Sequence, residues 1–178
     1  MEIRAACPSD AAGIAGVHVD SWRTTYRGIV PHNFLAALSY EQRERMWRGI
    51  LSPASGSSFV YVAECPGGQI VGFASGGPVR DLAPDYSGEL YAVYLLQDQQ
   101  RHGLGRRLIG AVVRRLIQAG MTSLLVWVLA DNPARKFYEA LGGQYVYDKR
   151  VSIGNARLVE VAYGWRDARI LAAGMPRG

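Results

Sequence analysis

The sequence predicts a single mixed α/β domain, and three observations support this prediction. Strand-like and helix-like segments alternate along most of the chain without an intervening linker. The segment Glu89–Leu95, rich in apolar and aromatic residues, leads through a glycine turn into the helical pattern of Leu104–Gln118. Two further pairs of strand-like segments are joined by short turns that contain glycine, as in hairpins. A chain of 178 residues is long enough for one domain with a real core.

In the first half of the chain, turn residues and capping signals mark the elements. A capping box, in which a serine and a glutamine three residues later satisfy each other's backbone groups, starts a helix at Ser39. Pro31 breaks the pattern that precedes it. The expected elements are the strand Glu2–Ala6, a helix from Pro8-Ser9-Asp10 toward Trp22, a helix from Ser39 through Trp47 to Leu51, and a hairpin of Phe59–Ala63 and Ile70–Ser75 across Cys65-Pro66-Gly67-Gly68.

The second half continues the alternation. Leucine or valine recurs every four residues from Leu104 to Leu116, which predicts an amphipathic helix. Leu124–Leu129 is almost continuously apolar, as in a strand that is buried on both faces. The remaining elements are a helix capped by Asn132, with Pro133 as its first residue and Gly142 at its end, and a hairpin of Gln144–Ser152 and Arg157–Trp165 across Gly154-Asn155. We place the domain at residues 1–166 and expect residues 167–178 to form an irregular, dispensable tail.

Composition excludes several classes of protein. The chain is 49% hydrophobic and 20% charged, as in globular domains, and it has neither an apolar run long enough to span a membrane nor a signal peptide. Its two cysteines suit neither a disulfide framework nor a metal site. We therefore expect a cytoplasmic, bacterial-type protein without a metal or a membrane partner.

The basic charge favours an anionic ligand. The formal net charge is +5 and the pI is about 9.4. A nucleic-acid-binding surface needs a dense basic stripe, but the arginines are spread over several elements and the only lysines are Lys136 and Lys149. We therefore expect a small anionic ligand and no nucleic acid.

The glycine turn Gln100-Arg101-His102-Gly103-Leu104-Gly105 is the most informative segment. Glycines at a strand-to-helix turn let backbone N–H groups approach a pyrophosphate, and the helix N-terminus adds partial positive charge. Arg106 and Arg107 oppose the helix dipole, an arrangement that a bound anion would relieve. The hexapeptide alone is equally compatible with glycines that only tighten the connection. A Walker A loop is excluded because its lysine is missing, and a dinucleotide fingerprint is disfavoured because Leu108 replaces its third glycine.

A second informative segment is Asn132–Gly143, which contains Phe137 and Tyr138. Consecutive helical residues point about 100° apart. If Phe137 lies in the core, Tyr138 therefore lies on the flank, near the ends of the neighbouring strands. A phenol in that place can donate a proton to a departing thiolate, although a tyrosine at the edge of a core often has only a packing role.

Together the two segments resemble the GNAT superfamily of acyl-CoA-dependent N-acyltransferases. Gln100–Gly105 matches the cofactor motif of that family, Glu89–Leu95 resembles the strand before it, and Asn132–Gly143 resembles its Asn…Ala…Phe-Tyr…Leu-Gly segment. The resemblance extends from residue 2 to about residue 165. It implies an α/β (α+β) domain with a central, mixed, mostly antiparallel sheet of about seven strands. In that sheet the parallel strands four and five splay apart, and about four helices flank it.

The resemblance also implies acetyl-CoA as co-substrate, bound between the two splayed strands. Backbone groups of the first splayed strand would meet the pantetheine arm and the thioester, backbone donors of the glycine turn would hold the pyrophosphate, and Asn132 would contact the pantetheine unless it only caps its helix. The implied cofactor-binding residues are Val93, Tyr94, Leu95, Gln100, Arg101, His102, Gly103, Leu104, Gly105, Arg106 and Asn132. The family commonly has proline where Gln97 stands, so the turn is expected to be looser here.

The implied reaction is direct transfer of the acetyl group to an amine of a small molecule or a peptide, through a ternary complex and without a metal. Tyr138 would protonate the departing CoA thiolate. Glu89 would accept a proton from the amine, unless it is only an exposed glutamate at a strand end. A CoA-binding regulatory module without turnover is the alternative function, and a nucleotide-binding domain is a third interpretation.

The acceptor side is the least defined part of the site. The resemblance places specificity on the N-terminal helices, where Trp22 and Tyr26 either form a pocket wall or pack into the core. Asp20, or the pair Asp81 and Asp85, could attract an amine. His18 is interpreted as structural. A homodimer is expected from the habit of the family.

Overall fold

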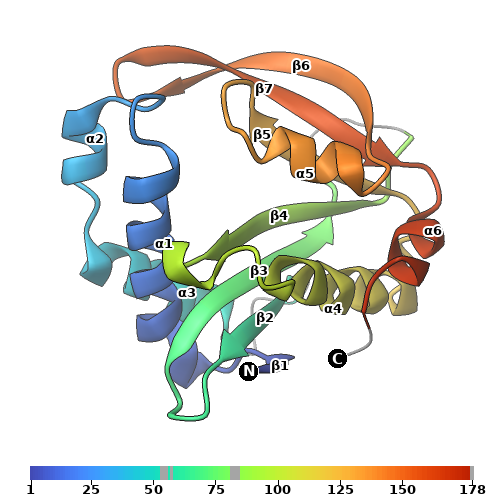
Figure 1. Ribbon diagram of the computed structural model, residues 1–178, viewed down its shortest axis with the longest axis horizontal. Helices are drawn as coiled ribbons and strands as arrows, with labels where there is room; N and C mark the ends of the chain where they lie inside the picture. The colour runs from blue at the N-terminus through green and yellow to red at the C-terminus, as the bar shows by residue number, and fades with distance from the viewer. Residues whose placement is uncertain (53–55, 57, 81–84, 177–178) are drawn as a thin grey trace.

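One seven-stranded sheet forms the centre of the protein (Figure 1). The computed structural model describes residues 1–52, 56, 58–80 and 85–176. The strand order is β1-β2-β3-β4-β5-β7-β6, and β4 and β5 are its parallel neighbours, which confirms the expected mixed sheet. The strands are β1 (Glu2–Ala5), β2 (Phe59–Glu64), β3 (Ile70–Pro78), β4 (Gly88–Leu95), β5 (Leu124–Leu129), β6 (Gln144–Ile153) and β7 (Ala156–Trp165).

The sheet opens between β4 and β5. These strands pair only where Gly88–Leu90 faces Leu124–Val126, and they diverge beyond that point. On the other side of β4, Ser75 pairs with Ala92 and Gly76 pairs with Leu90, so Tyr91 is an extra residue without a partner on β3. A bulge of this kind bends its strand. It therefore helps to turn the end of β4 away from β5.

Helices cover both faces of the first four strands. On one face, α1 (Ala11–Thr25) and α3 (Tyr40–Ile50) bury Ile14 and Trp47 against Phe73. On the other face, α4 (Leu104–Gln118) buries its apolar stripe, including Leu108 and Val112, against β2, β3 and β4. Ser39 Oγ accepts a hydrogen bond from Gln42 N at 3.2 Å, so the predicted cap of α3 is present.

The expectation that residues 167–178 form an irregular tail is wrong for the central part of this segment. Residues 168–173 form α6 (Ala168–Ala173), and Ala168, Leu171 and Met175 belong to the core cluster that contains α4. This segment is too short for its apolar residues to show a clear helical period. The burial of these side chains nevertheless stabilises the helix.

The other helices also refine the prediction. The described residues contain six α-helices rather than about four, because the short helices α2 (His32–Ala36) and α6 add to the four expected ones. The helix α5 (Arg135–Ala140) begins two residues later than expected. Arg135 N and Lys136 N donate to carbonyls three residues earlier, so the first turn after Asn132 is tighter than an α-helix.

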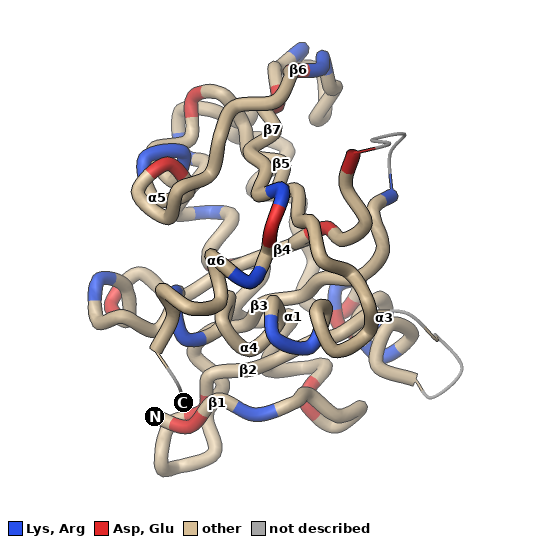
Figure 2. Tube along the Cα trace, turned by 90° about the vertical axis from the view of Figure 1, so that its right-hand side faces the viewer, with Lys and Arg blue, Asp and Glu red and all other residues tan. Residues whose placement is uncertain are grey.

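Charged residues are distributed over the whole molecule. Figure 2 shows Lys and Arg positions interspersed with Asp and Glu positions along the trace, as the sequence indicates. Within the described part of the chain, no helix combines the length and the apolar character needed to cross a membrane.

Candidate active site

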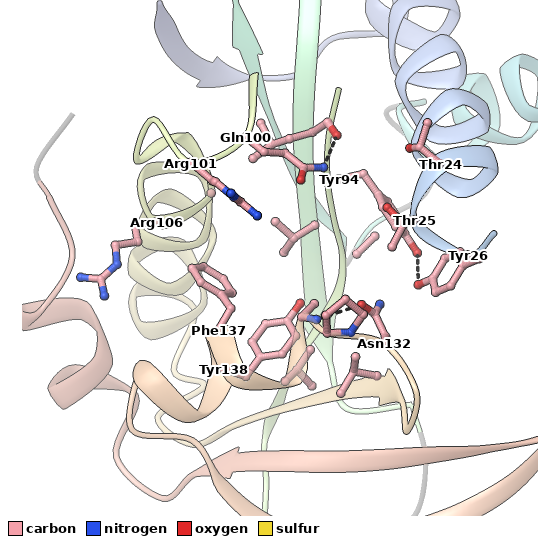
Figure 3. A pocket seen from close by; sticks show the side chains of 18 of the residues that line it. Thr24, Thr25, Tyr26, Tyr94, Gln100, Arg101, Arg106, Asn132, Phe137 and Tyr138 are labelled. Carbon is pink, nitrogen blue, oxygen red and sulfur yellow. Dashed lines mark hydrogen bonds between the residues drawn. The ribbon is translucent and has the colours of Figure 1, made fainter. Parts of the chain in front are cut away.

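A cavity of about 710 Å³ lies where β4 and β5 diverge (Figure 3). Residues 91–95 of β4 and 126–128 of β5 form its sides. The C-terminal end of α1, the glycine turn before α4, and residues 132–134, 137 and 138 close it. Side chains that are distant in sequence therefore meet at the gap in the sheet.

The glycine turn has a defined conformation at one end of this cavity. Gly103 has a φ of +80°, in the left-handed region that favours glycine. Gln100 Nε2 donates to Leu95 O at 3.2 Å, so Gln100 braces the turn against β4. A Cβ atom on Gly105 would stand 3.5 Å from Leu95 Cδ1 and 3.7 Å from Phe137 Cζ. The missing side chain of Gly105 thus keeps this part of the cavity wide.

The same turn presents unused hydrogen-bond donors. Among the described residues, none of the backbone N–H groups of residues 101–106 has a hydrogen-bond partner. The first N–H groups of a helix lack acceptors within the helix and carry partial positive charge. Arg101 and Arg106 also line the cavity, and Figure 3 shows that Arg101 extends toward it. The arrangement suits a phosphate or pyrophosphate group.

Tyr138 presents a phenol to the cavity from α5 (Figure 3). The residue is only 7% exposed, whereas Phe137 is partly buried, which reverses the expected placement of these two neighbours. Burial, with the nearby Tyr26 hydroxyl as the second cause, raises the pKa of Tyr138 well above its usual value. Its hydroxyl has no hydrogen-bond partner among the described residues. The phenol is therefore protonated at neutral pH and available as a donor.

Tyr26 and Tyr94 form the wall opposite α5. Both line the cavity, and their hydroxyl oxygens are 3.2 Å apart. Trp22 packs edge-on against Tyr26, with ring centroids 4.8 Å apart, but it does not line the cavity. Of the two predicted substrate residues, Tyr26 therefore lines the cavity and is also part of the hydrophobic core, whereas Trp22 packs behind Tyr26.

His18 lies behind this wall and has a structural role. Its Nδ1 accepts from Trp47 Nε1 at 3.1 Å, and its ring stacks on Tyr94 with centroids 5.4 Å apart. Burial, followed by the positive charge of Arg43, lowers the pKa of His18 to about 3. His18 is thus neutral at physiological pH.

Comparison with known proteins identifies the family. The FR47-like protein family matches residues 72–152. A protein of Bacillus subtilis (strain 168), named an uncharacterized N-acetyltransferase, YuaI, is 41% identical over 171 residues, which are 96% of each chain. The chain belongs to the GNAT superfamily of N-acetyltransferases. A second relative, the probable N-acetyltransferase Rv2775 of Mycobacterium tuberculosis, is 32% identical over 78% of this chain and 77% of its own.

A solved structure supports the GNAT fold. The PaiA N-acetyltransferase of Thermoplasma acidophilum, crystallised with coenzyme A, superposes with a TM-score of 0.71. The match covers 89% of this chain and 96% of the other, at 18% sequence identity. At that identity the comparison establishes the shared fold and leaves the acceptor undefined.

Within this GNAT fold, most of the predicted site residues meet at the cavity. His102 is exposed outside it, and Leu104 is buried in the core, so only their backbone groups belong to the turn. The predicted residues that line the cavity are Tyr26, Val93, Tyr94, Leu95, Gln100, Arg101, Gly103, Gly105, Arg106, Asn132 and Tyr138. Asn132 lines the cavity, and its Oδ1 accepts from Ala134 N at 2.9 Å in the turn before α5, so the expected helix cap is wrong because the N-cap of α5 is Ala134.

Glu89 does not line the cavity, and it is not the exposed strand-end glutamate that the sequence allowed. It is 1% exposed, because it lies in the short stretch where β4 pairs with β5. Its carboxylate accepts from Arg80 N at 2.9 Å and from Arg80 Nε at 3.1 Å, and it also pairs with Arg80 Nη2. A proton could reach Glu89 from the cavity only if this arrangement changed.

The other acidic candidates are also engaged elsewhere. Asp20 accepts from the Tyr40 hydroxyl at 2.6 Å, and Asp85 lies 3.3 Å from Arg166. Asp81 falls outside the described residues. Thr24 and Thr25 lie in the N-terminal segment to which the resemblance assigns specificity but were not singled out, and Tyr91, Trp127 and Phe137 were not predicted to line the cavity. The bulge at Tyr91 has no sequence signal, whereas the threonines could have been found from their position directly before Tyr26.

Proposed function

We propose that this protein is an N-acetyltransferase that transfers the acetyl group of acetyl-CoA directly to an amine of a small molecule or a peptide, through a ternary complex. The observation that carries the proposal is a single cavity that joins the free N–H groups of residues 101–106 to the unpaired hydroxyl of Tyr138. The names of the two sequence relatives and the coenzyme A in the PaiA structure support it.

The residues present fit the parts of coenzyme A. The N–H groups of residues 101–106 would bind the pyrophosphate, with Arg101 and Arg106 adding positive charge. The apolar surfaces of Leu95 and Phe137, left open at Gly105, would contact the pantetheine arm. Beyond Leu90 the β4 edge has no partner on β5, so backbone groups of this edge would bind the amides of that arm.

The structure limits which backbone groups of Leu95 could contact the cofactor. The carbonyl of Leu95 already accepts hydrogen bonds from Ser21 Oγ at 3.1 Å and from Gln100 Nε2 at 3.2 Å. We therefore assign the cofactor contacts to the backbone of Val93 and to the N–H group of Leu95. The Leu95 carbonyl instead joins α1 and the glycine turn to β4.

In the proposed reaction the neutral amine forms a C–N bond with the acetyl carbon and the C–S bond breaks. The amine loses one proton, and the departing sulfur receives one from the Tyr138 hydroxyl, which solvent then reprotonates. Holding the amine and the acetyl group together in one cavity supplies much of the rate enhancement. Glu89 could act as the base only after releasing Arg80, so water is the more direct acceptor of the amine proton.

The alternative is a CoA-binding regulatory module without turnover. The free and protonated Tyr138 hydroxyl favours the enzyme, because a binding module has no need of a proton donor at this place. A homodimer and a cytoplasmic location stay predictions.

Calorimetry with acetyl-CoA, and with ATP and NAD as controls, tests the first part of the proposal. Binding of acetyl-CoA alone is expected, and its absence would refute the cofactor assignment. Release of CoA in the presence of a panel of amines then separates the enzyme from the module. Binding without any amine-dependent release would favour the module.

A further inference from the structure

We propose that the acceptor is a primary amine of low pKa, on an apolar or aromatic body, which reaches the cavity uncharged. This inference rests on the proposed function and specifies its substrate class. We assign the acceptor half of the cavity to residues 24–26 at the end of α1 (Figure 3), to Tyr91, Ala92 and Tyr94 of β4, and to Trp127 of β5.

The first observation is the charge of the cavity wall. No aspartate, glutamate or histidine is present among the described residues that line it. Its charged side chains are Arg101 and Arg106, both at the α4 end. An ammonium group that entered would lose its hydration without meeting a counter-charge, and such burial is costly.

The second observation concerns Glu89 of β4 and Glu160 of β7, two carboxylates near this half of the site. Glu89, on the same strand as Tyr91, is buried and held by Arg80. Glu160, on β7, lies with one carboxylate oxygen 3.7 Å from Lys149 Nζ. Neither carboxylate lines the cavity, and each already faces a cation of the protein.

The third observation concerns the aromatic rings, since tyrosine and tryptophan faces can also bind cations. One face of the Tyr91 ring is covered by the guanidinium of Arg80 at 4.1 Å, and one face of the Trp127 ring by Lys149 Nζ at 3.9 Å. Tyr94 is stacked on His18. The protein's own groups thus already contact each of these three rings.

The consequence can be expressed as the fraction of amine that is neutral. At pH 7 an alkyl amine with a pKa of about 10.4 is neutral in about one molecule in 2,500, whereas an α-amino group with a pKa of about 8 is neutral in about one in 10. If only the neutral form binds, the second amine has an advantage of about 200-fold at pH 7 and about 20-fold at pH 9.

The test compares phenylalanine amide with phenethylamine, which has the same ring and a more basic amine. The ratio of their kcat/KM values with acetyl-CoA is measured from pH 7 to pH 9, because ionisation of the enzyme cancels in that ratio. We expect the ratio to favour the amide by about 200-fold at pH 7 and to fall about tenfold by pH 9. Because protonation of the two free amines alone makes this ratio fall with pH, its size at pH 7 decides the test: a ratio near one, or faster turnover of phenethylamine, would overturn the inference.

A matched pair of variants tests the same point from the side of the protein. Thr25 is partly buried and lines the acceptor half of the cavity. Thr25→Asp introduces a carboxylate there, and Thr25→Asn is its neutral control. We expect only Thr25→Asp to make phenethylamine a better substrate relative to the amide, by about tenfold in kcat/KM, and an equal effect of both variants would count against the inference.

The outcomes also separate this inference from the proposed function. If acetyl-CoA does not bind, the proposed function itself fails. If acetyl-CoA binds and another amine of the panel is acetylated but neither of these two is, the inference fails and the proposed function stands. If both amines are acetylated with a preference for the more basic one, only the inference fails.

Discussion

The hydroxyl oxygens of Tyr26 and Tyr94 lie 3.2 Å apart at the wall of the cavity. This contact joins the end of α1 to β4 at the level where β4 has left β5. It fixes the position of Thr24 and Thr25, which directly precede Tyr26 in the acceptor half of the site. The pair therefore links the stability of α1 to the shape of the acceptor side.

A double-mutant cycle on this pair measures that link. Tyr26→Phe and Tyr94→Phe each remove one hydroxyl and leave the other without its partner, so each is expected to lower the free energy of unfolding by about 1 kcal/mol. The coupling energy is expected to be about 0.5–1.5 kcal/mol, measured by urea denaturation of the wild type, both single variants and the double variant. Fully additive single effects would show that the two hydroxyl groups do not interact in solution.

Removal of the Tyr138 hydroxyl tests proton donation. Tyr138→Phe keeps the ring and its packing, so acetyl-CoA affinity is expected to stay within about twofold while kcat falls by about 100-fold, the lower range for loss of a general acid. Calorimetry and steady-state kinetics give the two values. Tyr26→Phe serves as the control for loss of a cavity hydroxyl, and an equal fall of kcat in both variants would remove Tyr138 from its special role.

The two glycines of the turn are expected to respond differently to alanine. Gly103 has open space around it but a left-handed φ, so Gly103→Ala should lower the free energy of unfolding by about 1–2 kcal/mol. Gly105 lies in the first turn of α4, and its new methyl group would stand between Leu95 and Phe137. Gly105→Ala should therefore weaken acetyl-CoA binding more than it changes stability. Urea denaturation and calorimetry on both variants measure the two quantities. A larger loss of stability in Gly105→Ala, or a larger loss of acetyl-CoA affinity in Gly103→Ala, would contradict this expectation.

Local sequence signals were sufficient for the part of the cavity to which we assign the cofactor. The bounds of α4 and β5 agree with the sequence, because a regular apolar pattern and a glycine at the helix end are local properties. The bulge at Tyr91 and the burial of Glu89 depend on how β4 pairs with β3 and β5, and no single segment encodes that pairing. Glu89 forms an ion pair with Arg80, which lies beyond the end of β3. The sequence alone therefore left the exposure of Glu89 undecided.

The buried His18 predicts a specific dependence of stability on pH. The folded protein holds the pKa of His18 at about 3, below its ordinary value of 6.5, so the unfolded chain binds more protons between these values. The contribution of neutral His18 to the free energy of unfolding is therefore fully present above about pH 6.5. It is lost as the pH falls toward 3, by at most about 1.4 kcal/mol per pH unit.

His18→Gln isolates this contribution, because glutamine can still accept from Trp47 Nε1 but does not titrate between pH 4 and pH 6. Urea denaturation at several pH values in that range should give a smaller slope of unfolding free energy against pH for the variant. Parallel curves for the two proteins would mean that His18 is accessible to protons in the folded state.

The C-terminal helix offers the sharpest test of packing, because neighbouring side chains there differ completely in burial. Leu171 is 3% exposed in the core cluster that contains α4, whereas Ile170 is 73% exposed. Leu171→Ala should lower the free energy of unfolding by about 2–4 kcal/mol, and Ile170→Ala by less than about 0.5 kcal/mol. Removal of residues 167–178 should cost more than Leu171→Ala, since it also uncovers Gly110, where Met175 packs so closely that a Cβ atom would come within 2.9 Å of it. If the truncated protein unfolds at the same urea concentration as the full chain, the segment is dispensable, as its sequence alone indicated.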